Sequence, residues 1–265
     1  ADTFTYWVVF TPTFVKNLIM SVDYFYIKVD GFISGYGADT ILNSCYQTGQ
    51  LCDLINRDPN QGNTFGSLWL GQNGYVVDFT TNTGTLRVQG IDVKGDYRVK
   101  ARDMGLGDMG SFVVDYVGTV NLKQETTPVP GDSTTTYQCK GKFGAQCGTP
   151  VPVYRHKLRT SWQMPWSDAT VSLAWRYIGG VKTDGIGDFN NRDDKLKPQS
   201  YFDLFSSISM DNKYTFRLGV NNVLDNDPPI VGNGGLPGVT GSGNTFPQVY
   251  DALGRFIFSS VTLDF

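Results

Sequence analysis

Alternation between apolar and polar residues constrains this chain more than any other feature of its sequence. In nine windows of about ten residues, apolar side chains occupy every second position. Successive side chains of a β-strand point to opposite faces, so each window predicts a strand with one apolar and one polar face. The windows are residues 4–10, 18–26, 91–99, 112–122, 157–164, 171–177, 202–208, 214–221 and 257–265.

Charged residues follow the same alternation. Within the windows, the polar positions carry six acids and six bases, whereas the apolar positions carry none. A face that meets hydrocarbon excludes charge, while the rim of a water-soluble sheet tolerates it. The pattern therefore predicts that the apolar face contacts lipid and that the polar face lines an enclosed interior. The acids are Asp23, Asp92, Asp96, Asp115, Asp203 and Asp264, and the bases are Lys94, Arg98, Lys157, Arg159, Arg176 and Arg217.

This reading assigns individual side chains to the two faces. Aromatic residues gather toward the ends of the windows, as in the girdles at membrane interfaces. The residues predicted to face the interior are Asp92, Lys94, Asp96, Arg98, Asp115, Lys157, Arg159, Arg176, Asp203 and Arg217. The residues predicted to face lipid are Leu173, Trp175, Phe216, Leu218, Val261, Leu263 and Phe265.

The connections between windows alternate between short and long. Outer-membrane barrels have short turns at the periplasmic end and long loops outside the cell, so these lengths favour a transmembrane antiparallel β-barrel over a soluble sandwich. Within the first long loop, an additional hairpin of residues 68–70 and 75–79 that projects outside the barrel is an alternative to an unstructured connection. The short connections are residues 11–17, 103–110, 165–168 and 211–213, and the long ones are residues 30–85, 123–153, 178–199 and 224–250.

Composition fits a folded membrane protein. The 265 residues include 17 Phe, 14 Tyr and 5 Trp, and only 18% are charged, which excludes a disordered chain. The net charge of −3 offers no basic face for phosphate backbones, so no nucleic acid partner is expected. A mean hydropathy of −0.22 is compatible with a transmembrane β-barrel, because only every second strand residue is apolar.

Four cysteines lie in two of the long loops. Cys45 and Cys52 fall in the first long loop, and Cys139 and Cys147 fall in the second. Neither spacing is a CxxC pair and no histidine lies nearby, so zinc is not expected. We predict two local disulfides formed in an oxidising compartment.

The sequence carries no recognisable catalytic motif. His156 is the single histidine, so a serine or cysteine nucleophile would depend on that residue. There is no GxSxG elbow, no HExxH and no phosphate-cradling glycine loop. We therefore predict no enzymatic activity, no metal and no cofactor, and we interpret His156 as an interfacial or loop-edge residue.

Several segments resemble a known family. They are residues 216–229 (FRLGVNNVLDNDPP), 175–180 (WRYIGG), 154–159 (YRHKLR) and 248–258 (QVYDALGRFIF). Together with the terminal Phe265 and residues 37–42 (GADTIL) before the first cysteine pair, they resemble the C-terminal part of a TonB-dependent outer-membrane receptor.

The resemblance implies a fold, a location and partners. It implies a 22-stranded barrel in the bacterial outer membrane, closed by an N-terminal plug domain. Such a receptor binds a scarce nutrient, for example an iron-siderophore or an oligosaccharide, at its extracellular loops. It imports the nutrient with energy from the TonB complex, which acts through the plug. Membrane lipid, a small nutrient ligand, and the plug or the remaining strands are the other expected partners.

The chain also departs from the family pattern. No plug domain or TonB box precedes Ala1, and nine antiparallel strands would leave the first and last strands parallel. Residues 1–265 are therefore expected to be the C-terminal part of a larger barrel. A passive pore or plug-less barrel fragment is an alternative function, and a soluble all-β binding module is a third.

The interior charges allow two interpretations. Their near balance favours ion-pair and hydrogen-bond ladders that hold the wall and a plug. Alternatively, some of them, with Arg87, Arg176 or Arg217, line a path for an anionic solute.

Overall fold

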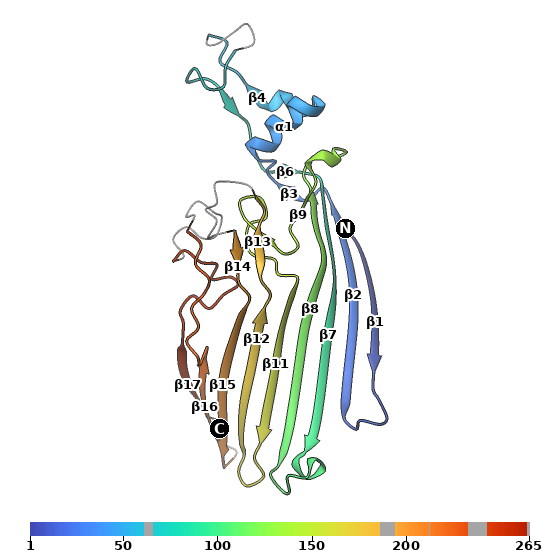
Figure 1. Cartoon of the computed structure of the whole chain (residues 1–265), viewed down its shortest axis with the longest axis vertical. Coiled ribbons are helices and arrows are strands. Elements are labelled where there is room, and N and C mark those ends of the chain that lie inside the picture. The colour runs from blue at the N-terminus through green and yellow to red at the C-terminus, as the bar shows by residue number, and fades with distance from the viewer. Residues whose placement is uncertain (61–65, 186–193, 212, 233–242, 264–265) are drawn as a thin grey trace. The chain divides into compact units, whose positions relative to one another are not determined.

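The structure is a computed structural model that describes residues 1–60, 66–185, 194–211, 213–232 and 243–263. Asp264 and Phe265, which were assigned to the interior and lipid faces, lie outside these ranges. The main sheet follows the order β1-β2-β7-β8-β11-β12-β15-β16-β17, with the short β9 (Tyr137–Gln138) paired to β8 (Figure 1).

Each predicted window corresponds to one of the nine long strands of this sheet, although Met164 follows the end of β11 and residues 264–265 lie outside the described ranges, so the predicted all-β fold is confirmed. The strands pair with their sequence neighbours, as expected for an antiparallel meander. Their bounds are β1 (Asp2–Phe10), β2 (Leu18–Asp30), β7 (Thr85–Lys100), β8 (Ser111–Thr127), β11 (Tyr154–Gln163), β12 (Ala169–Ile178), β15 (Gln199–Met210), β16 (Tyr214–Asn221) and β17 (Phe256–Leu263).

Several strands extend beyond the windows predicted for them. β7 begins at Thr85 instead of residue 91, and β8 continues to Thr127 instead of ending at residue 122. Residues Lys123 to Thr127 are polar on both faces, so apolar alternation is lost there although backbone pairing continues, and Glu125 and Thr126 pair with β9. The alternation of apolar residues therefore locates the part of a strand that has an apolar face. It does not locate an extension that is polar on both faces.

The chain divides into two compact units. The first comprises residues 1–4, 26–88 and 123–138, and the second comprises residues 5–25, 89–122 and 139–265.

The first unit contains a helical insertion that the sequence did not predict. Its elements are β3 (Ile33–Ser34), α1 (Ala38–Thr48), the 3-10 helix η1 (Cys52–Leu54), β4 (Ile55–Asn56), β5 (Tyr75–Val76), β6 (Thr81–Asn82) and the 3-10 helix η3 (Ser133–Thr135). Gly49 ends α1 in the left-handed conformation, and the first predicted disulfide joins Cys45 of α1 to Cys52 of η1.

Two carboxylates, those of Asp78 and Asp132, hold α1 in this unit. Asp78 accepts hydrogen bonds from the backbone N–H groups of Tyr36 and Gly37, immediately before α1. Asp132 accepts hydrogen bonds from the Thr134 backbone and from Ser44 of α1, and the bond from the Thr134 hydroxyl lowers the pKa of Asp132. The carboxylates therefore tie segments distant in sequence to the helix.

The alternative hairpin of residues 68–70 and 75–79 does not form. β5 pairs instead with β4, with Ile55 opposite Val76, while Trp69 and Leu70 are exposed. The Ser67 hydroxyl accepts hydrogen bonds from the backbone N–H groups of Trp69 and Leu70, which holds these residues in a turn that cannot pair as a strand.

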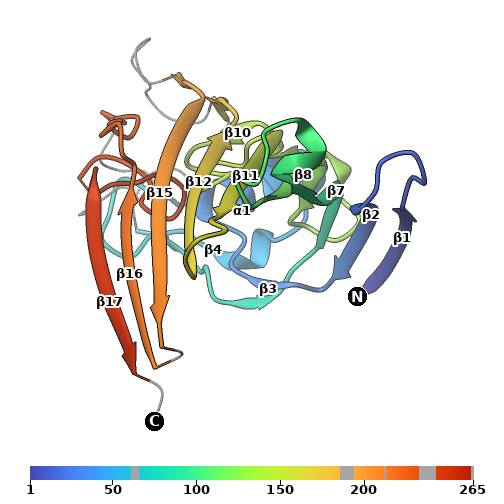
Figure 2. The same cartoon turned by 90° about the horizontal axis from the view of Figure 1, so that it is seen from below.

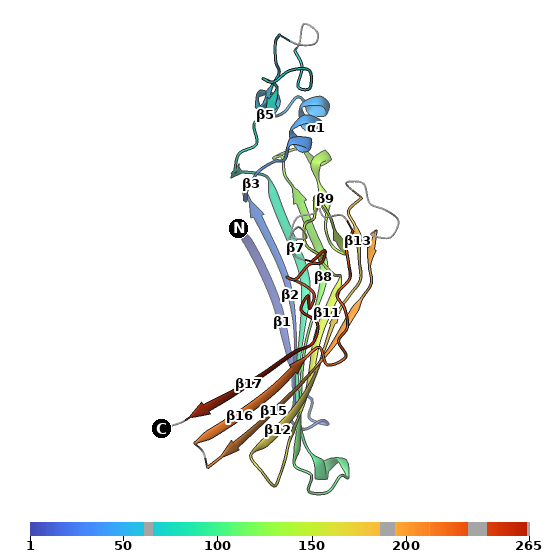
Figure 3. The ribbon, with the colours of Figure 1, turned by 90° about the vertical axis from the view of Figure 1, so that its left-hand side faces the viewer.

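In the second unit, the register separates the two faces of the sheet as predicted from alternation. Leu158, Trp175 and Phe202 are direct partners along one row, and Arg159, Ala174 and Asp203 are partners along the next. Directly opposed residues share a face, so these two rows lie on opposite faces. Figure 2 shows β15, β16 and β17 side by side in one layer, and Figure 3 shows the same layer from the side.

The short connections after β1, β7 and β11 are hairpin turns at one end of the second unit's sheet (Figure 1). The turn after β7 contains the 3-10 helix η2 (Ala101–Met104), and it closes with a hydrogen bond from the Ala101 N–H to the Gly110 carbonyl. The helices of the described residues are all too short or too polar to cross a membrane.

At the other end, three long loops share a small core. β10 (Lys142–Phe143) pairs in parallel with β13 (Val181–Thr183), which pairs with β14 (Lys195–Leu196). The second predicted disulfide, Cys139–Cys147, closes the β10 loop and contributes about 2 to 3 kcal/mol in the chain-entropy model. The buried core residues are Phe143, Val181, Leu196, Val231, Phe246 and Tyr250.

Two adjacent valines of β8 test the assignment of the faces. Val114 is opposite Thr160 on the apolar face, and Val113 is opposite Ser161 on the polar face. If the apolar face contacts the middle of the bilayer, Val114→Arg should lower the free energy of unfolding by about 2 to 4 kcal/mol. Val113→Arg should cost much less, because its guanidinium would meet the polar interior.

Chemical unfolding of the full-length protein in lipid vesicles measures both changes. Equal losses for the two variants would contradict the predicted orientation.

Candidate functional site

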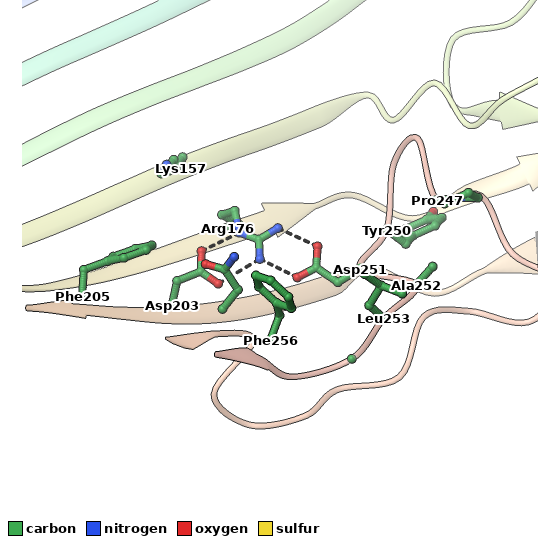
Figure 4. A pocket seen from close by; sticks show the side chains of 12 residues that line it. Lys157, Arg176, Asp203, Phe205, Pro247, Tyr250, Asp251, Ala252, Leu253 and Phe256 are labelled. Atoms are coloured by element: carbon green, nitrogen blue, oxygen red, sulfur yellow. Dashed lines mark hydrogen bonds and ion pairs between the residues drawn. The ribbon is translucent and has the colours of Figure 1, made fainter. Parts of the chain in front are cut away.

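Arg176 is the centre of a charged cluster on the polar face, next to the loop core. Its guanidinium donates to both carboxylate oxygens of Asp203 at 2.7 and 2.8 Å, and to both carboxylate oxygens of Asp251, one of them at 2.9 Å (Figure 4). It also stacks over the buried Tyr201 ring at 5.1 Å. Two bidentate pairs fix the group in position and orientation.

Asp251 belongs to the loop between β16 and β17, so this cluster attaches the loop to the sheet. Asp203 and Arg176 come from adjacent strands, β15 and β12. The Asp203 carboxylate is only 4% exposed and also accepts the backbone N–H of Asn222 at 2.9 Å. The wall and the loop are thus joined through one guanidinium.

Asn222 determines how the chain leaves β16. Its backbone is left-handed with φ 51°, and its side chain is fully buried. The side-chain amide donates to the Asn226 carbonyl and accepts from the Asn226 N–H, both at 2.9 Å, while Asn226 donates to the Ser200 carbonyl. Asparagine tolerates this backbone conformation better than most residues. The GVNNVLD run therefore forms a tight exit turn that directs the loop back over the sheet.

Two pockets lie between this loop and the polar face. The first, here called the Arg176 pocket, has a volume of about 500 Å³ and is lined by Arg176, Asp203, Asp251 and the side chains shown in Figure 4. Tyr250 closes one side. Its buried hydroxyl has no hydrogen-bond partner among the described residues, and burial raises its pKa.

The second pocket, here called the loop-side pocket, has a volume of about 530 Å³. Arg155, Lys157 and Arg176 line it together with Thr119 and loop residues including Gln248, and no carboxylate side chain is among its lining residues. Arg155 and Lys157 are exposed, and neither forms an ion pair within the described part of the chain. This pocket therefore presents two unneutralised cations.

The predicted ladder of ion pairs along the polar face is largely absent. Of the six bases in the windows, Arg176 alone has a carboxylate oxygen within 4.0 Å in the described ranges. Arg87, a further candidate from the sequence, is paired with Glu125 at 3.1 Å in the first unit. The bases without such a partner are Lys94, Arg98, Lys157, Arg159 and Arg217.

Several acids of the polar face make contacts other than ion pairs. Asp92 accepts a hydrogen bond from Thr119 at 2.7 Å, and Asp115 lies opposite Arg159 in register but not within ion-pair distance. Asp96 and Asp115 lie beside each other on β7 and β8. Acids and unpaired bases therefore alternate along the β7 window, whereas β11 carries unpaired bases and no acid on this face.

The residues assigned to lipid that lie within the described ranges share one face. Leu173 is opposite Leu204, Phe216 is opposite Val261, and Leu218 is opposite Ser259. Trp175 lies in the same row as Phe202, and Leu263 is opposite Tyr214. Their contact with lipid remains a prediction.

His156 belongs to an aromatic cluster on this apolar face. Its ring meets Trp175 edge-on at 4.5 Å and stacks on Tyr177 at 5.4 Å, with Tyr116 and Tyr154 also in contact. Arg155 and Lys157 point to the opposite face by strand alternation. No group of three or more potential metal ligands occurs among the described residues.

Sequence reasoning missed the residues that join the loop to the sheet. Asp251, Tyr201, Tyr250 and Asn222 lie outside the charge pattern, and three of them are in a loop or exit turn. The signal available in the sequence was the asparagine-rich run 221–226, because buried asparagines in left-handed turns are typical of chain exits. That run was noted only as part of a family resemblance.

Comparison with known proteins agrees with this architecture. Residues 4–223 match the family model described as TonB dependent receptor-like, beta-barrel. The chain belongs to this family. Barrels of TonB-dependent receptors reside in the bacterial outer membrane, and the family is one of non-enzymatic transporters, in agreement with the predicted location and class. No curated protein sequence matches the chain.

Solved TonB-dependent receptors share the fold at low sequence identity. The ferric enterobactin receptor PfeA of Pseudomonas aeruginosa is 13% identical with a TM-score of 0.57, and the siderophore receptor PirA of Acinetobacter baumannii is 14% identical with a TM-score of 0.54. The FrpB iron transporter of Neisseria meningitidis is 11% identical with a TM-score of 0.55. Each match covers 99% of this chain but only 30 to 31% of the other chain.

Removing the guanidinium of the cluster tests its contribution to stability. Arg176→Gln leaves two carboxylates without their counter-charge, so the free energy of unfolding of the full-length receptor should fall by about 3 kcal/mol. Arg102→Gln is the control, because the Arg102–Asp108 pair is exposed and should contribute less than about 0.5 kcal/mol. Denaturant titration compares the two. An equally small effect at Arg176 would contradict the proposed attachment of the loop.

Substitutions of Asn222 separate backbone strain from hydrogen bonding. Asn222→Gly keeps the left-handed backbone at no steric cost but loses the side-chain bonds to Asn226. Asn222→Ala loses the same bonds and adds strain of about 1 to 2 kcal/mol. The alanine variant should therefore be less stable than the glycine variant by about that amount in the same titration. Equal stability of the two would show that the turn stores no such strain.

Proposed function

We propose that this chain is part of an outer-membrane receptor that captures an anionic nutrient at the loop end of the polar face and imports it with energy relayed by the TonB complex. The observation that carries the proposal is the loop-side pocket, in which Arg155 and Lys157 have no carboxylate partner. The sequence alone had favoured neutralised charges on this face.

The size and charge of the loop-side pocket support a small anionic ligand. Its volume of about 530 Å³ falls within the range of small-molecule sites, roughly 300 to 1,000 Å³. Arg155 and Lys157 have no ion-pair partner within the described residues, so they add positive potential to the pocket, and a positive potential raises the local concentration of anions. Arg155 and Lys157 come from one strand at alternate positions, so both project from the same face.

An iron-siderophore is the nutrient class that best fits these features. Ferric complexes of catecholate or carboxylate chelators carry negative charge, which matches Arg155 and Lys157. The names of the structural relatives, a ferric enterobactin receptor and a siderophore receptor, agree with this class at the level of the fold. An oligosaccharide is a weaker candidate, because it would not use the unpaired cations.

The rest of the receptor is proposed to lie outside residues 1–265. The sheet has β1 and β17 as its edges, and unpaired backbone groups cost several kcal/mol each in hydrocarbon. Closure with antiparallel pairs requires an odd number of further strands, since nine strands leave β1 and β17 parallel. We infer that these strands and an N-terminal plug complete the barrel, and that the plug contacts the TonB complex.

Two other functions lead to different observations. A passive pore would conduct ions continuously in a planar bilayer and would not need TonB. A soluble all-β module would purify without detergent, which the family membership of the chain disfavours.

Uptake of an iron-loaded catecholate tests the proposal. Bacteria producing the full-length receptor should accumulate radioactive iron supplied as ferric enterobactin, and deletion of TonB should abolish accumulation. Arg155→Gln and Lys157→Gln should each weaken binding of the complex about ten- to hundredfold, because a hydrogen bond to a charged group contributes about 1.5 to 3 kcal/mol.

Lys94→Gln is the matched control, since Lys94 is an exposed base of the polar face outside both pockets. Accumulation without TonB, or equal loss in all three variants, would contradict the proposal.

A further inference from the structure

A third pocket lies on the polar face of the sheet, nearer the short turns. This pocket, here called the turn-side pocket, has a volume of about 160 Å³ and is lined from β11, β12, β15, β16 and β17. Its polar lining consists of two arginines and several hydroxyl groups, with no carboxylate side chain. The polar residues are Arg159, Thr170, Ser172, Ser206, Ser207 and Arg217.

Arg159 is held in this pocket by neutral groups. Its Nη2 donates to the Ser172 hydroxyl at 3.1 Å, and Ser172 in turn donates to the Ser161 hydroxyl at 2.8 Å. The guanidinium lies over the Phe205 ring at 5.5 Å. Its Nε is buried and has no acceptor among the described residues. The guanidinium is therefore only partly satisfied by the described residues, and its Nη groups carry a positive charge that no ion pair among those residues neutralises.

Arg217 reaches the same pocket from β16, also without a counter-charge. Its Nη1 donates to the Thr262 hydroxyl at 3.0 Å, and it has no ion pair in the part of the chain that the structure describes. Two like charges in one small pocket repel each other, and this repulsion is relieved when an anion binds between them.

The walls of the pocket are aromatic and depend on a glycine. The rings of Phe205 and Phe258 lie 6.0 Å apart. Gly219 lies opposite Phe258 in the register, and a Cβ at this position would come within 2.2 Å of the Phe258 ring. The absence of a side chain at Gly219 therefore gives Phe258 its place beside the pocket.

We propose that the turn-side pocket binds one oxyanion group, a carboxylate or a phosphate, through Arg159 and Arg217. The inference rests on the proposed receptor function, because it takes the polar face to line the path of the solute. Hydroxyl donors and planar guanidinium groups are suited to oxyanions, and the aromatic walls limit access of water.

The position of the pocket gives it a role after capture. Arg155, Lys157 and Arg159 occupy alternate positions of β11, so successive cations on the polar face are about 7 Å apart along the strand. Arg155 and Lys157 belong to the loop-side pocket, and Arg159 belongs to the turn-side pocket. A solute that leaves the loop-side pocket therefore meets Arg159, two positions further along β11 than Lys157.

Phosphate binding to the purified full-length receptor tests this site. Because the loop-side pocket also attracts anions, the experiment uses the double variant Arg155→Gln/Lys157→Gln as its background. Phosphorus NMR should still detect saturable binding of inorganic phosphate in that background, and acetate should compete. Adding Arg159→Gln or Arg217→Gln should each weaken phosphate binding about tenfold.

Arg98→Gln in the same background is the control, since Arg98 is an exposed base of the polar face outside the three pockets. Heat-dependent migration on gels verifies that each variant is folded. The phosphate affinities of the Arg159→Gln and Arg217→Gln variants are compared with each other. Absence of phosphate binding in the background, or equal weakening by Arg98→Gln, would overturn the turn-side site. Uptake of the ferric complex by the unmodified receptor would still test the proposed function separately.

Discussion

Backbone hydrogen bonding is the constraint on which the rest of this structure depends. A strand in hydrocarbon has no water to satisfy its N–H and C=O groups, so it must pair on both sides. Seven of the nine long strands have two neighbours in the sheet, and β1 and β17 have one each. Pairing fixes the register, and register then places alternate residues on two faces of different polarity. The charge pattern and the pockets of the second unit follow from this arrangement.

Apolar packing, a disulfide and side-chain hydrogen bonds hold the loops of the second unit. Phe143, Val181 and Phe246, from three different connections, share one buried core, and Cys139–Cys147 closes one of those connections. Asn222 turns the chain at the end of β16, and Asp251 binds the Arg176 guanidinium. Apolar packing and a charge-assisted contact thus hold the same loop, which gives the polar face a defined cover instead of a solvated connection.

Charge balance on the polar face is global and not local. The windows contain equal numbers of acids and bases, and the charges of the β7 window balance within that strand, but β8 contributes Asp115 whereas β11 contributes Lys157 and Arg159. Arg176 uses two carboxylates, which leaves fewer for its neighbours. Charge is therefore distributed unevenly among the strands of a face whose formal charge is close to zero.

Alternation in the sequence determined the nine strands and their two faces, and the cysteines of the long loops determined the two local disulfides. Both are local signals in the sequence. Alternation did not determine the polar ends of β7 and β8, where both faces are polar, or α1, which the distant Asp78 holds at its start and the distant Asp132 holds at Ser44. Only the tertiary structure decided which charges pair. Asp251 reaches Arg176 across 75 positions of sequence, and Arg159 remains without a carboxylate although Asp115 is directly opposite. Such contacts depend on how loops fold back over strands, and no local sequence pattern predicts the path of a loop.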